Sequence, residues 1–455
     1  MVGRFHLKRV LIANRGEIAL RAIRSCRQLS LESVAVYSSA DTNSAHRFAA
    51  DKAVCIGPPP PKSSYLSVGA LIETAHSLNC DAIYPGYGFL AENSEFARRC
   101  AEEDLIFIGP DSECIAQMGD KVAARQAAAK AGIPVVPGSE HGFTSVEEAE
   151  PASREIGYPL LLKASGGGGG RGMRVVDKPE DFVSQFEQAT AEAQAAFGNG
   201  EIYIERFFSK VRHIEIQVFG DQHGNYVHLG ERDCSVQRRH QKLIEESPSP
   251  VISETTRKEM AEAAVALIST LKYVNAGTIE FIYDTASGKF FFIEMNTRIQ
   301  VEHPVTEIVT GTDLIREQFR VAAGEKLSFN STFGQGRSAI EFRINAEDAS
   351  RNFQPSPGTL KRWRPPSGHN VRVDSHAYEN YVVPPYYDSM LAKLIVHGED
   401  RAAAIEVAKF ALSQFQVTGV TTVIPFHEYL LNRPEFVQAE VHTRWIEENL
   451  QMAAH

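Results

Sequence analysis

The residues best suited to chemistry lie in a predicted β-hairpin, Thr278–Asn296. With a five-residue turn at Thr285–Lys289, Glu280 stands directly across from Glu294, and like charges that face each other in a ladder are destabilising. A divalent cation between the two carboxylates would remove that repulsion. Asn296 projects to the same face as Glu294, so the hairpin offers three hard oxygen ligands of the kind that Mg²⁺ or Mn²⁺ prefers. Taken alone, these three polar residues fit a solvent-facing strand edge equally well.

Polar residues continue beyond the hairpin at every second position. Arg298, Gln300 and Glu302 follow Asn296, and an extended segment would present them all on one face. A cation beside a carboxylate that can act as a base is what binding and deprotonating a small oxyanion requires. A surface strand also alternates, but rarely with Asn, Arg, Gln and Glu followed at once by His-Pro. The alternation therefore favours a metal site next to an oxyanion site.

A glycine run provides the third chemical signal. Lys163 ends a strand-like segment and is followed by Ala, Ser and the glycines Gly166–Gly170, with Arg171 next. The N–H groups of such a backbone can fold over phosphate oxygens. The Walker sequence GK[ST] is missing, so this is not a P-loop. A flexible linker is the simpler interpretation of a bare glycine run, but this run lies directly between two strand-like segments.

The elements that precede these residues alternate between strand and helix. The strand-like segments are Arg9–Ala13, Val34–Tyr37, Ala53–Ile56, Ala82–Tyr84 and Ile106–Ile108, and the helical ones include Glu17–Leu29, Leu66–Ser77 and Ser94–Glu102. This rhythm predicts a doubly wound parallel sheet that ends near Pro110. The turn after the first strand lacks GxGxxG, which disfavours a dinucleotide fold of the dehydrogenase type.

The rest of the chain divides into two parts. After a helical stretch at Glu113–Ala131 and a Pro/Gly-rich connection, a small middle domain contains one long helix and three strands: Tyr158–Lys163, Met173–Val176, Asp181–Phe197 and Ile202–Glu205. From His213 the pattern is mixed and rich in strands, and it ends in the helices Arg401–Gln414 and Pro425–Leu431. The fold class is therefore α/β in the first part and mixed α+β in the last.

Composition limits the function further. The formal net charge of -10 argues against a nucleic-acid surface, because phosphate binding needs a basic excess. No apolar run is long enough to cross a membrane, and no signal peptide is recognisable. The 6 cysteines lack CxxC spacing, so we expect buried free thiols in a reducing cytoplasm, without zinc or disulfides.

Several long motifs, in order along nearly the whole chain, resemble those of biotin carboxylases in the ATP-grasp superfamily. They are Ile12–Ile18, Tyr84–Leu90, Met118–Lys121, Lys163–Met173, Glu231–Ser235, Gln237–Lys242, Glu294–Glu307 and Arg343–Asp348. The resemblance implies an N-terminal biotin carboxylase domain at 1–112, a helical connection at 113–134, an ATP-grasp lid domain at 135–207 and a C-terminal ATP-grasp and biotin carboxylase domain at 208–455.

The resemblance also implies a role for individual residues. ATP would be bound by Lys121, Lys163, Gly169, Gly170, Glu205, Arg206, Phe207, Phe208, His213 and His240, and the metal by Glu280, Glu294 and Asn296. Bicarbonate would be bound by Lys242, Arg298, Gln300, Val301 and Glu302. Glu302 matches the base that deprotonates bicarbonate, Arg343 matches the group that stabilises the biotin enolate, and Tyr87 falls near biotin. Arg206 stands where the family has lysine.

The implied activity is that of an ATP-dependent ligase. It uses ATP, Mg²⁺ or Mn²⁺ and bicarbonate to carboxylate biotin on a carrier protein, through carboxyphosphate. No Met-Lys-Met biotinylation motif occurs, and no carboxyltransferase region follows Leu431, so we expect the biotin carboxyl carrier protein and the carboxyltransferase on separate chains. We further expect a cytoplasmic homodimer without nucleic-acid or membrane partners. Acetyl-CoA carboxylase, and hence fatty acid biosynthesis, is the first expected setting, with another acyl-CoA or a keto-acid carboxylase second.

Two other classes of protein share part of this pattern. A carbamoyl phosphate synthetase half or a purine-pathway carboxylating synthetase would have the lysines, the glycine loop and the metal carboxylates, but is not expected to carry the Arg298–Pro304 or Arg343 motifs. A nucleotide-binding regulatory subunit has no need of a base, Glu302, beside Lys242 and Arg343. Both alternatives are therefore disfavoured.

Overall fold

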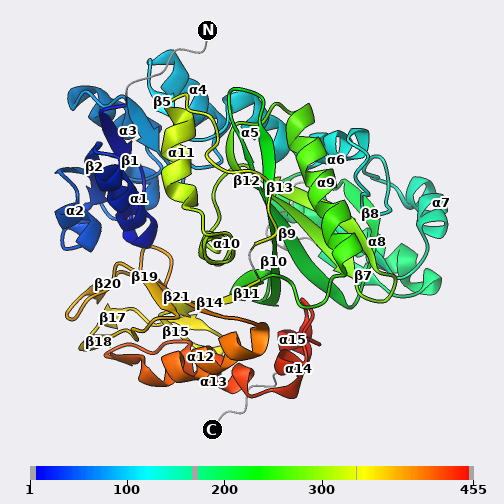
Figure 1. The fold of residues 1–455 in the computed structure, drawn as a ribbon. Coiled ribbons are helices and arrows are strands. Elements are labelled where there is room, and N and C mark those ends of the chain that lie inside the picture. The colour runs from blue at the N-terminus through cyan, green and yellow to red at the C-terminus, as the bar shows by residue number, and fades with distance from the viewer. Residues whose placement is uncertain (1–6, 166–172, 335, 450–455) are drawn as a thin grey trace.

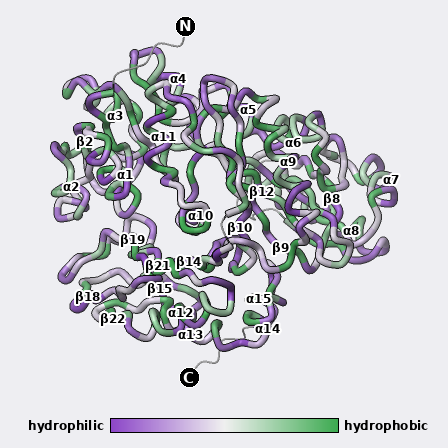
Figure 2. The backbone as a smooth tube through the Cα atoms, in the orientation of Figure 1, coloured by the Kyte–Doolittle hydropathy of each residue, from purple (hydrophilic) through white to green (hydrophobic). Residues whose placement is uncertain are grey.

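The protein has an N-terminal lobe, a small lid lobe and a large central sheet that continues into a C-terminal lobe (Figure 1). The computed structural model describes residues 7–165, 173–334 and 336–449. The lobes surround a short central helix, α10 (His303–Thr310). In the hydropathy view α10 is among the hydrophobic segments, whereas α7 (Val146–Ile156), at the outer edge of the lid, is largely hydrophilic (Figure 2).

The N-terminal lobe is a five-stranded parallel sheet in the order β3-β2-β1-β4-β5. Its elements are β1 (Arg9–Ile12), α1 (Gly16–Gln28), β2 (Glu32–Ser38), α2 (Ala45–Ala49), β3 (Lys52–Gly57), α3 (Val68–Ser77), β4 (Ala82–Tyr84), α4 (Ser94–Glu102) and β5 (Ile106–Phe107). Along β1, Val10 and Ile12 pack in the cluster that contains the inner face of α1, whereas Leu11 packs in the one that contains residues of α3 and α4. Helices cover both faces, which confirms the predicted doubly wound sheet.

The predicted helical stretch at Glu113–Ala131 is two helices, α5 (Ser112–Gly119) and α6 (Lys121–Lys130). Asp120 between them has an extended backbone, and its side chain accepts a hydrogen bond from the Ala123 amide at 2.8 Å. A short polar side chain that caps the next helix ends the previous one. Asp120 thus divides the predicted helical stretch into two helices.

The lid is a three-stranded antiparallel sheet in the order β7-β6-β8 with two helices. Its elements are α7, β6 (Leu160–Ala164), β7 (Met173–Val176), α8 (Phe182–Phe197) and β8 (Ile202–Arg206). Leu160 and Leu162 pack with Phe182 and Phe186 of α8 in one core. The helix α7 was not predicted. The predicted strand Tyr158–Lys163 starts two residues before β6, although Pro159 has no N–H for a ladder.

The central sheet has eight strands in the order β13-β12-β9-β10-β11-β14-β21-β19, and every pair is antiparallel. The strands are β9 (Val211–Gly220), β10 (Tyr226–Arg238), β11 (Gln241–Ser247), β12 (Asn275–Asp284), β13 (Lys289–Asn296), β14 (Ser338–Asn345), β19 (Val371–Ser375) and β21 (Met390–Gly398). The helices α9 (Glu254–Thr270), α10 and α11 (Leu314–Ala322) accompany them. One sheet thus joins the ATP-grasp region to the C-terminal lobe.

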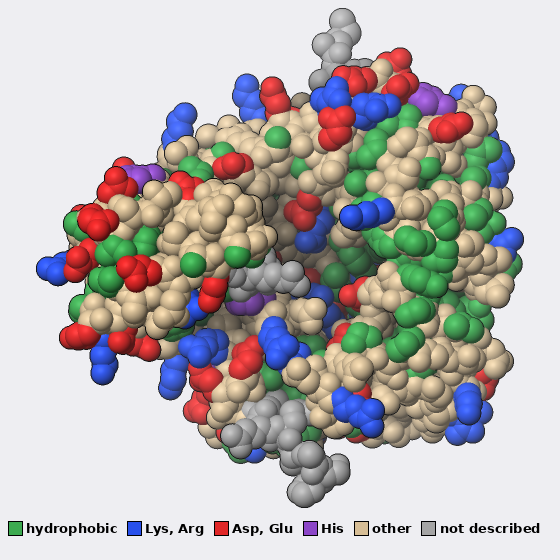
Figure 3. All heavy atoms as spheres, turned by 180° about the vertical axis from the view of Figure 1, so that it is seen from behind, with side chains coloured by type: hydrophobic (Ala, Val, Ile, Leu, Met, Phe, Trp, Pro, Cys, Tyr) green, Lys and Arg blue, Asp and Glu red, His purple; other side chains and the backbone are tan. Residues whose placement is uncertain are grey.

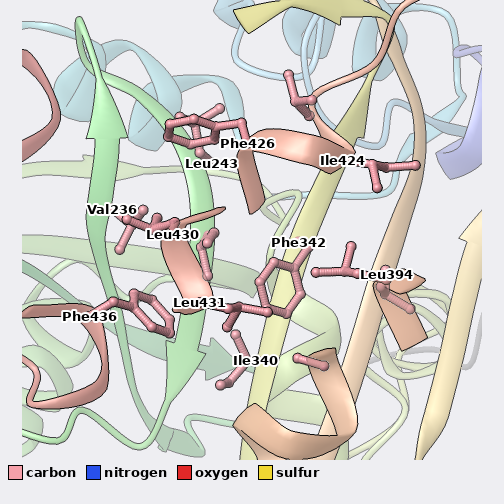
Figure 4. Packing of buried hydrophobic residues seen from close by; sticks show 14 of the residues in the cluster. Val236, Leu243, Ile340, Phe342, Leu394, Ile424, Phe426, Leu430, Leu431 and Phe436 are labelled. Carbon is pink, nitrogen blue, oxygen red and sulfur yellow. The ribbon is translucent and has the colours of Figure 1, made fainter. Parts of the chain in front are cut away.

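The C-terminal lobe adds helices and short two-stranded ladders to this sheet. They are β15 (Glu347–Asp348), β16 (Gln354–Pro355), β17 (Gly358–Thr359), β18 (Arg362–Arg364), β20 (Val382–Val383), α12 (Arg401–Gln414), β22 (Gln416–Thr418), α13 (Ile424–Leu431), α14 (Pro434–Val437) and α15 (Trp445–Asn449). Phe342 and Leu394 from the sheet pack against Leu430 and Leu431 of α13 (Figure 4). This core holds the far end of the sheet in place.

Two expectations from composition can be compared with the fold. In the described part of the chain, no helix is both long and apolar enough to cross a membrane. All 6 cysteines are free, as expected, and five of them are buried. Cys55 is the exception and is exposed, because β3 is an edge strand of its sheet.

Candidate active site

The hairpin β12–β13 brings Glu280 directly opposite Glu294, as predicted. The turn is one residue shorter than expected, since Asp284 pairs with Lys289. A β-bulge between Glu280 and Phe281 then shifts the register by one residue and restores the pairing. Without the bulge, Glu294 would point to the other face, because side chains alternate along a strand.

Glu280 is the most heavily bonded of the predicted metal ligands. Its Oε1 accepts hydrogen bonds from Lys242 Nζ at 3.0 Å, Asn296 Nδ2 at 3.0 Å and Gln300 Nε2 at 2.8 Å, and its Oε2 lies 3.0 Å from His213 Nε2. Burial opposes ionisation of Glu280, but Lys242 and His213 hold its pKa well below the usual value. Four predicted residues therefore meet at one carboxylate.

Glu294 and Asn296 complete a donor set that fits a hard divalent cation. Glu294 is open to solvent, yet the surrounding protein and Glu280 raise the pKa of its carboxyl. Two opposed carboxylates and an amide oxygen are ligands that suit Mg²⁺. His213, Glu215 and Glu280 also hold possible ligand atoms within 4.8 Å of one another. Glu215, however, is already paired with Arg232 and Lys242, so the hairpin set fits better.

The segment after Asn296 does not stay extended up to Glu302, which was the condition for its polar side chains to share one strand face. The strand β13 ends at Asn296, the chain turns, and Glu302 is the N-cap residue of α10. The polar side chains nevertheless converge. Arg298 donates to Asn296 Oδ1 at 3.1 Å, and Lys242 Nζ donates to Gln300 Oε1 at 3.2 Å. The turn thus brings these polar side chains together, as an extended strand was expected to do.

Glu302 lies between two cations. Its Oε1 accepts from Lys242 Nζ at 2.6 Å and its Oε2 from Arg343 Nη2 at 2.9 Å. Glu302 is buried, which disfavours its charge, but Lys242, Arg343 and Arg232 hold its pKa far below the ordinary value. Three of the four residues predicted to be catalytic thus form one connected group of charges: Lys242, Glu302 and Arg343.

Three residues without a predicted role contact this group or Arg298. Glu215 accepts from Lys242 at 2.6 Å and from Arg232 at 2.5 Å. Arg232 stands in the Glu231–Ser235 motif, and Glu215 alternates with the polar residues His213 and Gln217 along β9; these are the signals that could have found them. Glu92, from the N-terminal lobe, accepts from Arg298 Nε at 2.9 Å, and local sequence gives no sign of that contact.

Several predicted ATP residues gather where the lid meets the central sheet. Lys163 and Arg125 both donate to the Glu205 carboxylate. The Phe208 ring stacks on Phe291 with centroids 5.1 Å apart, and the Phe207 ring lies under Arg444 at 5.6 Å. These contacts fix both sides of the predicted hinge.

The remaining predicted ATP residues are less closely grouped. The Arg206 guanidinium reaches the Ile156 carbonyl at the end of α7, at 3.5 Å. Lys121 and His240 are exposed, Lys121 in the first turn of α6 and His240 in the β10–β11 turn with φ of 64°. Gly169 and Gly170 lie outside the described residues.

Tyr87 approaches the site from the N-terminal lobe. Its hydroxyl donates to Glu17 at 2.6 Å, and its ring faces Lys393 Nζ at 5.9 Å. Lys393 is fully buried and donates to the Val301 carbonyl at 2.9 Å. Tyr87 is therefore linked to the predicted bicarbonate segment through one lysine. Seen from behind, the molecule has a deep hollow between its lobes, with acidic and basic side chains at the floor (Figure 3).

Comparisons with known proteins agree with this arrangement. Three family models match: "Biotin carboxylase, N-terminal domain" at residues 6–115, "Carbamoyl-phosphate synthase L chain, ATP binding domain" at 120–330 and "Biotin carboxylase C-terminal domain" at 341–448. Biotin carboxylase 1 of Bacillus subtilis is 52% identical over 442 residues, which cover 97% of this chain and 98% of the relative.

Two solved structures are similar over almost the whole chain. The biotin carboxylase–βγ-ATP complex from Campylobacter jejuni is 45% identical, with a TM-score of 0.92 and coverage of 97% of this chain and 99% of that one. The biotin carboxylase domain dimer of Hydrogenobacter thermophilus 2-oxoglutarate carboxylase, in complex with MgADP, ADP and bicarbonate, is 44% identical, with a TM-score of 0.91 and 97% coverage of both chains. With its three domains matched and its relatives aligned end to end, the chain belongs to the biotin carboxylase family.

Proposed function

We propose that this protein is a biotin carboxylase, which uses ATP and bicarbonate to carboxylate biotin on a carrier protein. The observation that carries the proposal is the placement of Glu302, a buried carboxylate between Lys242 and Arg343. Lys242 also bonds Glu280, which faces Glu294 in the hairpin. A base, an oxyanion-binding cation and a metal-ligand pair are thereby joined within one set of hydrogen bonds.

The first half-reaction deprotonates bicarbonate. Lys242 and Arg298 bind the anion, with Gln300 and the Val301 backbone beside them, and Glu302 takes its proton. The bicarbonate oxygen then attacks the γ-phosphorus of ATP, ADP leaves, and carboxyphosphate forms. In the unliganded site Lys242 keeps the pKa of Glu302 low. An incoming anion that shares Lys242 weakens this effect, so the base becomes stronger when its substrate is present.

The second half-reaction transfers the carboxyl group. Carboxyphosphate breaks down to CO₂ and phosphate, the phosphate takes the proton of the biotin ureido nitrogen, and that nitrogen attacks CO₂. Arg343 offsets the negative charge that develops on the ureido oxygen, and Tyr87 lies at the biotin side. The lid keeps water from the labile intermediate.

The nucleotide lies between the lid and the central sheet in this proposal. Lys121, Lys163 and the loop of Gly169 and Gly170 contact the phosphates. The hinge of Glu205, Arg206, Phe207 and Phe208 lines the adenine, with His213 and His240 nearby. Glu280, Glu294 and Asn296 would hold Mg²⁺, which offsets phosphate charge when bound. The domain boundaries at 112, 134 and 207 stay a prediction.

The partners follow from the same activity. We propose that the biotin carrier and the carboxyltransferase are separate chains, that the protein is a cytoplasmic homodimer, and that acetyl-CoA carboxylase is the first candidate for the whole system. The match to 98% of the length of Biotin carboxylase 1 of Bacillus subtilis supports a carrier on another chain. Intact-mass analysis of the purified protein checks this point, and a biotin adduct on this chain would contradict it.

Steady-state ATP hydrolysis tests the function itself. We expect ATP cleavage that requires bicarbonate and rises when free biotin is added, with carboxybiotin as product. Bicarbonate-dependent cleavage that biotin leaves unchanged, with carbamoyl phosphate formed on adding ammonia, would indicate a different ATP-grasp ligase. Nucleotide binding without any cleavage would indicate a regulatory subunit.

A further inference from the structure

Two buried glutamates face each other beneath the proposed catalytic arginine. Glu245 on β11 and Glu341 on β14 are register partners in the central sheet, and both side chains are fully buried. Directly opposed residues project to the same face with their Cβ atoms about 5 Å apart. Arg343, two residues after Glu341, projects to that face as well. The proposed function gives neither glutamate a role.

Hydrogen bonding around this pair is incomplete. Glu245 Oε1 accepts from Arg343 Nε at 2.6 Å. Neither oxygen of Glu341, nor Oε2 of Glu245, has a hydrogen-bond partner among the described residues. Two opposed, buried carboxylates with three unbonded oxygens cannot both stay charged at moderate cost. One proton between them removes a charge and supplies the missing hydrogen bond.

Five charged or titratable side chains act on the pair: Lys242, Arg343, Lys393, Glu302 and Tyr87. They come from β11, β14, β21, the N-cap of α10 and the N-terminal lobe.

Each of the cations has another partner. Lys393 bonds the Val301 carbonyl and lies 3.1 Å from Glu17, and Lys242 bonds Glu302. The helix α10, which packs on β14, adds His303 and Glu307, and Glu307 is paired with Arg21 and Arg372. No cation in the described part of the chain makes an ion pair with Glu341 that would hold it ionised.

The direction of the pKa shifts agrees with one retained proton. Burial raises the pKa of Glu341 well above its ordinary value, and the attraction of Lys393 does not reverse this. Burial likewise raises the pKa of Glu245 to about 7, although Arg343 lowers it. At neutral pH the proton therefore stays on Glu341, the partner without an arginine.

We propose that Glu245 and Glu341 share one proton, and that Glu341 is a positioning residue that holds Glu245 in place against Arg343. The carboxyl O–H of Glu341 donates to Glu245 Oε2, which leaves Oε1 for the Arg343 guanidinium. Only the functional part of this inference, that Arg343 serves the biotin step, rests on the proposed function. When the proton is lost at alkaline pH, two opposed negative charges pull on one guanidinium, and the geometry of Arg343 changes.

Two substitutions separate a positioning role from a merely structural one. Glu341→Gln keeps an N–H donor toward Glu245 at every pH, whereas Glu341→Leu keeps the bulk and removes the donor. Glu406→Gln, on the exposed face of α12, is the control for loss of one carboxylate. We measure biotin carboxylation and bicarbonate-dependent ATP cleavage side by side from neutral to alkaline pH, together with infrared spectra of the protonated-carboxyl band.

The expected results differ for each variant. Wild type and Glu406→Gln lose carboxylation relative to ATP cleavage as the pH rises, and their carboxyl band disappears over the same range. Glu341→Gln lacks the band and keeps its ratio of the two activities on the alkaline side. Glu341→Leu loses carboxylation on the order of tenfold at neutral pH, because a charged acceptor is left unbonded, while ATP cleavage falls less.

Other outcomes overturn the inference. A carboxyl band that persists unchanged in Glu341→Gln, an alkaline loss identical in all variants, or a Glu341→Gln protein that fails to fold would each contradict a neutral Glu341. If wild type shows no biotin-dependent activity at all, the proposed function fails. The infrared titration would still decide whether the proton is shared.

Discussion

Replacing Glu302 by glutamine tests the central assignment most directly. The change removes the proposed base while it keeps the size of the side chain. Lys242 retains Glu215 at 2.6 Å and Glu280 at 3.0 Å, and Arg343 retains Glu245 at 2.6 Å. Neither cation is left unpaired, so the folding cost is limited to the lost charge-assisted hydrogen bonds, about 1.5–3 kcal/mol.

The effect on the reaction should be much larger than the effect on the fold. Loss of a general base costs about 10²–10⁴ in rate, which corresponds to about 3–5 kcal/mol of barrier. Because bicarbonate is deprotonated in the first half-reaction and the second half-reaction uses its product, bicarbonate-dependent ATP cleavage and biotin carboxylation should fall together in Glu302→Gln. Arg343→Ser should instead keep much of the ATP cleavage and lose carboxylation, because Arg343 acts once biotin carries charge.

The assay follows ADP and carboxybiotin from the same reaction mixture for each variant. Thermal unfolding is recorded in parallel, so that a loss of activity is not mistaken for a loss of fold. Arg343→Lys is the matched control, as it keeps the charge without the bidentate geometry. A Glu302→Gln protein with normal ATP cleavage, or an Arg343→Ser protein that loses both activities in proportion, would refute the division of labour between the two residues.

Three further changes probe the metal site, the oxyanion site and the fold. Glu294→Gln should raise the Mg²⁺ concentration needed for ATP cleavage and leave the unliganded fold as stable or slightly more stable, since it removes the repulsion with Glu280; unchanged Mg²⁺ dependence would contradict the metal assignment. Arg298→Lys should raise the KM for bicarbonate about tenfold with a smaller change in kcat, and a KM like that of wild type would exclude Arg298 from the oxyanion site. Asp41→Asn should cost about 3–5 kcal/mol in urea unfolding at neutral pH, because it leaves the Arg15 guanidinium buried and unpaired. Although burial opposes it, Arg15 lowers the pKa of Asp41, so this stabilisation is present above the unfolded pKa of 3.8 and is lost as the pH falls further; Asp41→Asn should lack that loss.

Local sequence patterns were enough to predict the elements that depend mainly on residues close together in the sequence. The parallel sheet followed from alternating strands and helices, and the pairing of Glu280 with Glu294 followed from the length of the hairpin. The prediction of this pairing was nevertheless correct only because two errors cancelled each other. The predicted turn was one residue too long, and the β-bulge in the hairpin was not predicted. A bulge depends on how the hairpin packs against β9, and the strand's own sequence does not show it.

Contacts between lobes could not be predicted in this way. Glu92 and Glu17 reach the site from the N-terminal lobe, and Lys393 reaches it from β21, each far away in the sequence. Asp120 shows a second limit, because one capping side chain divides the predicted helical stretch Glu113–Ala131 into two helices. A sequence pattern shows which face of a helix or strand is apolar, but it does not show which faces pack together.

The charges around Glu302 bear on how this residue could act as the proposed base. Glu302 caps α10, where the helix dipole favours a carboxylate, but its side chain makes no capping bond and turns to Lys242 and Arg343 instead. These cations keep the carboxylate ionised, and therefore free to accept a proton, at any pH near neutrality. The same cations make it a poor base until an anion competes for Lys242. A base buried alone would be stronger but largely protonated, and one exposed to water would be ionised without binding the substrate. In the proposed mechanism, the basicity of Glu302 would therefore depend on whether bicarbonate shares Lys242.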